Sequence, residues 1–131
     1  MQQHSIGQAS RLSNVKIPTI RYYEQIGLLS PLPRNEGNRR SFDNTALKRL
    51  TFIRHARGLG FDIVAIRTLL QLQDEPEQCC NEADTIARNR LADVEHRIHA
   101  LFDMRRELKQ MIYACPLNQV SECRIIAKIA Q

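Results

Sequence analysis

The sequence predicts a mainly helical fold, with a small basic head followed by one long helix. Two short helical segments joined by a tight polar turn open the chain, as in a helix-turn-helix. A stretch rich in proline, glycine and asparagine at 30–40 excludes a helix there. A seven-residue apolar repeat then runs from Ala87 to Ile112 and predicts a coiled coil.

The head should begin with two short helices. Ser5 can cap a helix over Ile6 to Leu12, and Ser13-Asn14 is a turn signal. Pro18 suits the first turn of a second helix, because its missing N–H has no partner to lose at that position. Gly27 supplies the end of that helix. The pair is a helix-turn-helix candidate.

Two further helices complete the head. A loop or short hairpin over 30–40 precedes them and carries three arginines. Either Asp43 or Asn44 can cap the third helix, and Asp62 can cap the fourth, because short polar side chains accept the first backbone N–H groups of a helix. Two glycines separate these helices.

A long helix is expected from Asn81 to Ala114. At about 1.5 Å per residue it would be about 50 Å long, which exceeds what so small a domain can cover. We therefore expect a homodimer formed by a two-stranded coiled coil, and periodicity alone leaves parallel and antiparallel pairing open. Pro116 ends the helix, and a short final helix is expected from Cys123 to Ile129. The repeat consists of Ala87, Leu91, Val94, Ile98, Leu101, Arg105, Leu108 and Ile112.

The charge distribution separates two parts of the chain. Residues 1–73 contain eleven Lys and Arg against four Asp and Glu, whereas residues 74–131 contain eight against ten. A basic head favours nucleic acid as partner. We expect a DNA-binding domain at 1–73, a linker at 74–80, a dimerisation helix at 81–114, and a metal-binding loop with a C-terminal helix at 115–131. With neither a signal-peptide pattern nor an apolar stretch of membrane-spanning length, a cytoplasmic location away from the membrane is expected.

Three clusters of side chains could contact double-stranded DNA. One lies on or near one face of the second helix, one lies in the loop, and one lies on the third helix with its two arginines three residues apart. Such cations bind phosphates, and arginine can also read guanine. The candidates are Arg21, Tyr22, Gln25, Arg39, Arg40, Arg54 and Arg57.

Four cysteines form a second candidate site. Cys115 and Cys123 bracket a seven-residue loop, while Cys79 and Cys80 stand just before the long helix. In a reducing compartment such cysteines are thiols or metal ligands rather than disulfides. Plain buried thiols remain an alternative for the loop pair. Because a thiol oxidoreductase would need Cys-x-x-Cys beside a strand, and no other catalytic motif is present, we expect no enzyme activity.

Four stretches of the head form a specific pattern: Thr19 to Glu24, Gly27 to Leu29, Glu36 to Arg40, and Phe52 to Phe61. On these residues the chain resembles the MerR family of winged-helix regulators. The resemblance implies a winged helix-turn-helix head, a long antiparallel dimerisation helix and a C-terminal effector loop. Arg39 and Phe42 stand where the family usually has tyrosines, and phenylalanine has no hydroxyl to donate to phosphate.

The resemblance also implies the ligand set of a metal sensor. By this resemblance, Cys80 of one chain and Cys115 and Cys123 of its partner would bind one metal ion together. Cys79 would be a spare thiol or an alternative ligand. Cysteine at position 80 is similar to the branch that senses zinc, cadmium, lead or mercury. The seven-residue loop resembles the copper(I) branch instead, so copper(I) stays an alternative, as does a thiol-redox or drug-responsive regulator with the same head.

The function implied is a transcriptional switch. Without metal, the homodimer would bind promoter DNA and repress transcription. With metal it would distort the DNA, present the promoter to RNA polymerase, and activate genes for metal resistance and efflux.

Overall fold

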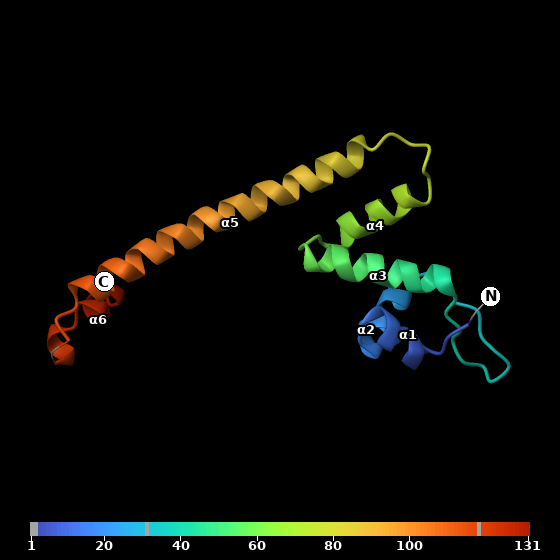
Figure 1. Ribbon diagram of the computed structural model, residues 1–131, viewed down its shortest axis with the longest axis horizontal. Helices are drawn as coiled ribbons and strands as arrows, with labels where there is room; N and C mark the ends of the chain where they lie inside the picture. Colours follow the sequence, from blue (N-terminus) through green and yellow to red (C-terminus); the bar gives the residue numbers. More distant parts are fainter. Residues whose placement is uncertain (1–2, 31, 118) are drawn as a thin grey trace. The chain divides into compact units, whose positions relative to one another are not determined.

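The computed structural model describes residues 3–30, 32–117 and 119–131 and is mainly helical (Figure 1). Its compact units are Met1–Ile86 and Ala87–Gln131. In the described residues, six α-helices, one 3₁₀ turn and two isolated β-bridges form the secondary structure. This confirms the predicted mainly helical class, while the four domain boundaries given above stay predictions. Among the described helices, none is long and apolar enough to cross a lipid bilayer.

The first two helices form as the sequence indicates. Helix α1 (Ile6–Ser13) starts at Ser5, whose hydroxyl accepts a hydrogen bond from the N–H of Gln8 at 3.2 Å. The Gln8 side chain accepts one from the N–H of Ser5 in return, at 2.9 Å, so both ends of a capping box are present. Asn14, with φ of 61°, turns the chain towards α2 (Ile17–Gln25).

Helices α3 (Asn44–Gly58) and α4 (Ile63–Gln73) begin at acidic caps. Asp43 caps α3 by accepting a hydrogen bond from the N–H of Ala46 at 2.9 Å, which decides between the two predicted caps. Helix α1 packs against α2 and α3, and α3 packs against α4. The largest fully buried side chains of this core are Phe42, Ile20, Leu28, Leu50, Ile53, Ile66 and Leu70.

The segment from Pro33 to Ser41 forms a short hairpin, which we call the wing. Arg34 and Arg40 form an antiparallel bridge, and the N–H of Ser41 donates to the carbonyl of Pro33 at 2.9 Å. The side chain of Asn35 accepts from two N–H groups inside the turn, and Asn38 adopts a left-handed φ of 58°. Asparagine tolerates this conformation better than most residues, so the wing's turn is set locally.

Helix α5 (Asn81–Ala114) has the expected bounds and is followed by a 3₁₀ turn (Val120–Glu122) and α6 (Arg124–Ile129). Of the described residues of α5, Met111 alone is buried. The predicted apolar seam of α5 is largely exposed on the single chain. Its exposed large apolar members are Leu91, Ile98, Leu101, Leu108 and Ile112.

Candidate DNA-binding surface and cysteine pair

The wing and α2 line one open hollow of about 500 Å³ on the head. Arg21 reaches it from α2, and Arg39 and Arg40 reach it from the wing. Because these three predicted DNA contacts share one hollow, it is the most strongly cationic part of the predicted DNA-binding set. Tyr22 and Gln25 are exposed on the same helix, so α2 presents all three of its candidate DNA contacts to solvent.

Arg40 also fixes the wing to α2. Its Nε donates a charge-assisted hydrogen bond to the carboxylate of Glu24, and both side chains are largely shielded, at 30% and 21% exposure. The remaining guanidinium N–H groups of Arg40 can still bind an anion, because arginine has five donors. Sequence reasoning missed the role of Glu24, since the partners are 16 residues apart and the contact depends on how the wing folds back.

Arg34 is a second residue that sequence reasoning left without a role. It lines the same hollow, and one of its terminal nitrogens donates to the carbonyl of Asn38 at 3.1 Å. Arg34 therefore adds charge to the hollow and braces the turn of the wing. Two adjacent arginines, Arg39 and Arg40, are a recognisable basic cluster in the sequence. A single arginine after a proline is not a recognisable signal for DNA binding.

Phe42 serves the core instead of the surface. Its side chain is fully buried, and its backbone pairs with His4 through two hydrogen bonds of 2.8 Å. The side chain of Phe42 therefore does not lie on the surface of the head. Arg54 and Arg57 are exposed on α3, and Arg57 also donates to the carbonyl of Phe61 at 3.2 Å.

The loop after α5 brings two of the predicted metal ligands together. The Sγ atoms of Cys115 and Cys123 lie 3.8 Å apart, and both residues are half-buried. Cys79 and Cys80 are exposed at the start of α5. Across the part of the chain that the structure describes, no three His, Cys, Asp or Glu side chains gather as a metal site. A single copy thus shows a pair of thiols rather than the predicted three.

The loop backbone lowers the pKa of the Cys115 thiol below its ordinary value. The largest cause is a hydrogen bond from the backbone of Leu117, and partial burial opposes it. A contact with the Cys123 thiol and hydrogen bonds from the backbones of Arg124 and Ile125, at the start of α6, lower the pKa further. These N–H donors favour the thiolate, which is the form that binds metals and reacts with electrophiles.

We expect Cys115 to be alkylated at a lower pH in the folded protein than in the unfolded chain. A depressed thiol pKa means that the thiolate appears earlier as the pH rises. Reduced protein would be treated with iodoacetamide across a pH series, and Cys115 would be followed by mass spectrometry with and without urea. Identical pH profiles in the two states would contradict the role assigned to the loop donors.

Comparison with known families identifies the head. A family model described as MerR HTH family regulatory protein matches residues 4–73, and one described as MerR, DNA binding matches residues 47–111. The chain belongs to the MerR family. As a member it is a DNA-binding transcription regulator and not an enzyme. The sequence-based recognition and the helix-turn-helix head are thereby confirmed.

Similar proteins extend the likeness over almost the whole chain. The heavy metal-dependent transcription regulator 2 of Rhizobium meliloti (strain 1021) is 37% identical over 126 residues, covering 96% of this chain and 86% of that protein. The lead(II) complex of PbrR691 from Ralstonia metallidurans CH34 has a TM-score of 0.82 at 33% identity and covers 96% and 98% of the two chains. The mercury(II) complex of MerR from Bacillus megaterium MB1 has a TM-score of 0.70 at 28% identity and covers 94% and 95%.

Proposed function

We propose that this MerR-family regulator is a homodimer that senses a thiophilic divalent metal ion through Cys80 of one chain and Cys115 and Cys123 of the other. The observation that carries the proposal is the approach of the Cys115 and Cys123 sulfurs to 3.8 Å in the loop after α5. Three similar proteins support the proposal. The Rhizobium meliloti regulator is named as heavy metal-dependent, and the two structures are complexes with lead(II) and mercury(II).

Promoter DNA is the partner of the head. The hollow lined by Arg21, Arg39 and Arg40 offers cations to phosphates, and α2 offers exposed polar side chains to base edges. Arg54 and Arg57 supply further phosphate contacts from α3. Within this proposal Arg21 and Gln25 contact base edges. Tyr22 and the arginines of the wing and α3 bind the phosphate backbone of the DNA and so position the head.

A second copy of the chain covers the seam of α5. Leu101 and Ile112 are 61% and 62% exposed on the single chain, and leaving apolar side chains in water forgoes the free energy of burying them. Burial of this heptad seam against an antiparallel copy would bring the start of one helix near the end of its partner. Cys80 would then complete the pair formed by Cys115 and Cys123 of the other chain.

The two neighbouring thiols favour a thiophilic ion over a hard one. Thiolates select soft or borderline ions over calcium and magnesium, so zinc, cadmium, lead and mercury are the candidates. Cysteine at position 80 is similar to the family branch that senses these divalent ions.

Copper(I) is the second candidate. The seven-residue spacing between Cys115 and Cys123 resembles that of the family's copper(I) branch, in which the loop pair alone holds the ion. Copper(I) bound in this way would leave Cys80 without a role. A thiol-redox or drug-responsive regulator with the same head remains a further alternative, and the cysteine pair would serve its redox form.

The regulator would work in the cytoplasm as a switch on bound DNA. Without metal the dimer occupies the operator and represses. Metal binding ties Cys80 to the partner's loop and repositions the heads, which distorts the promoter for RNA polymerase and activates genes for metal resistance and efflux. DNA deformation of this kind costs on the order of a few kcal/mol, and the difference in metal affinity between the two states supplies it.

The proposal is tested by metal competition on reduced protein combined with transcription from the operator. We expect one ion per three-thiolate site, and transcription that rises with zinc, cadmium, lead or mercury. Copper(I) should bind without requiring Cys80. An operator-bound protein whose transcription ignored all five ions would overturn the assignment as a metal sensor.

A further inference from the structure

Two arginines from other helices of the head hold the segment that directly follows α2. Arg67 of α4 donates to the carbonyl of Ile26, the C-cap residue of α2, at 2.8 Å. Arg49 of α3 donates through Nε to the carbonyl of Leu28 at 3.2 Å. The side chain of Leu28 is buried in the core of the head, so this segment is tied to the core as well as to α3 and α4.

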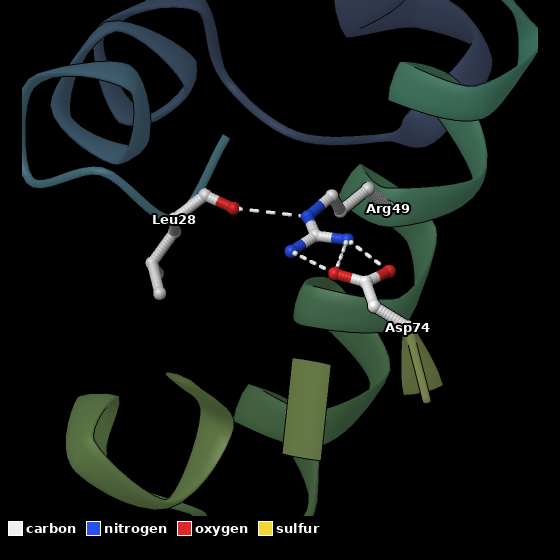
Figure 2. A network of polar contacts seen from close by, with 3 residues as sticks. All are labelled: Leu28, Arg49 and Asp74. Atoms are coloured by element: carbon white, nitrogen blue, oxygen red, sulfur yellow. Dashed lines mark hydrogen bonds and ion pairs between the residues drawn. The ribbon is translucent and has the colours of Figure 1, made fainter. Parts of the chain in front are cut away.

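Arg49 also reaches the linker between the head and α5. Its two terminal nitrogens lie 3.2 to 3.4 Å from the carboxylate of Asp74, the residue that follows α4 and opens the linker (Figure 2). One guanidinium therefore bridges the segment that follows α2 and the start of the linker. An ammonium group could not span both partners in this planar manner.

The linker is short and turn-rich between Asp74 and Cys80. The N–H of Glu75 donates to the carbonyl of Leu72 at 3.0 Å, and the N–H of Gln78 donates to that of Glu75 at 3.0 Å. Pro76 restricts the backbone further. Only five residues separate Asp74 from Cys80, so both residues belong to one short segment with two turn hydrogen bonds.

We propose that Arg49 is a positioning residue that transmits the metal-bound state of Cys80 through Asp74 to the reading helix α2. This inference rests on the proposed function, because it assumes that metal capture displaces Cys80. Arg49 touches neither the ion nor a base. It makes the position of α2 depend on the linker. The position of α2 then differs between the metal-free and the metal-bound state of Cys80.

The test compares Asp74→Asn, Arg49→Lys and a matched control, Glu77→Gln. The control removes an exposed charge from the same linker without touching the bridge. For each variant the ratio of metal-induced to metal-free transcription, the metal-free operator affinity and the thermal unfolding midpoint are measured. We expect the induction ratio to fall about threefold in both bridge variants, as suits a partly exposed ion pair, and to stay unchanged in the control.

The outcomes separate the two proposals. If the unaltered protein shows no induction by any of the ions, the proposed function fails. If the unaltered protein responds and Asp74→Asn keeps its induction ratio, the relay is overturned, whether or not operator affinity or the unfolding midpoint changes. Should Arg49→Lys fold poorly, Asp74→Asn decides alone, since the Asp74 side chain is 60% exposed.

Discussion

Replacing Cys80 with serine is expected to abolish the response to divalent metal while the protein still binds its operator. Serine removes one of three thiolates and leaves the loop pair as an incomplete site. Even the loss of groups that only orient metal ligands lowers affinity about 10- to 100-fold, so loss of a ligand should cost at least about 100-fold. Metal binding would be measured by competition with a chromogenic chelator, and function by transcription from the operator.

Cys79→Ser provides the matched control, because it removes a neighbouring exposed thiol from the same turn. We expect this variant to keep both its metal affinity and its induced transcription. If Cys80→Ser instead responded to divalent ions like the unaltered protein, the three-thiolate site would be rejected. A loss confined to Cys79→Ser would move the ligand one position along the chain.

Replacing Arg21 with alanine is expected to weaken operator binding and to relax base preference. A side chain that reads a base through paired hydrogen bonds contributes about 1–3 kcal/mol to discrimination, which corresponds to about 5- to 150-fold in affinity. Binding to the operator and to unrelated DNA of equal length would be compared by fluorescence anisotropy. The ratio of the two affinities should fall, because unrelated DNA lacks the contact that is lost.

Arg54→Ala is the comparison that separates base reading from phosphate anchoring. It should weaken binding to both DNAs alike and make the salt dependence shallower by about two units in a dimer, since each lost phosphate contact contributes about 0.9. An Arg21→Ala variant that behaved in this second way would be assigned to the phosphate backbone. A variant with unchanged affinity for both DNAs would remove Arg21 from the interface.

The helices could be predicted because their signals are local. Ser5, Asp43 and Asp62 each cap a helix with a side chain that bonds three residues along the chain, and the heptad from Ala87 to Ile112 lies entirely within α5. Local chemistry says less about how segments meet. The contact between Arg40 and Glu24 and the bridge made by Arg49 join residues 16 to 25 positions apart, and periodicity carries no record of them.

The candidate sites divide in the same manner. Arg21 and the wing arginines were found because cations cluster in the sequence of the head, and the structure adds the hollow that collects them. The pairing of Cys115 with Cys123 follows from a short loop closing on itself. The place of Cys80 could not be read from one copy, because the proposed third ligand comes from a second chain and only the family resemblance points to it.

In the proposed site one ion is held by cysteines of two chains, and mixed dimers distinguish such a site from one within a single chain. One subunit would carry Cys80→Ser, and the other would carry Cys115→Ser with Cys123→Ser, with different affinity tags to purify the heterodimer. Neither homodimer should hold the ion tightly. The heterodimer should bind one ion, because the intact Cys80 of one subunit meets the intact loop of the other. If the heterodimer bound no ion while the unaltered dimer bound two ions, each site would lie within a single chain. The proposed site between two chains would then be rejected.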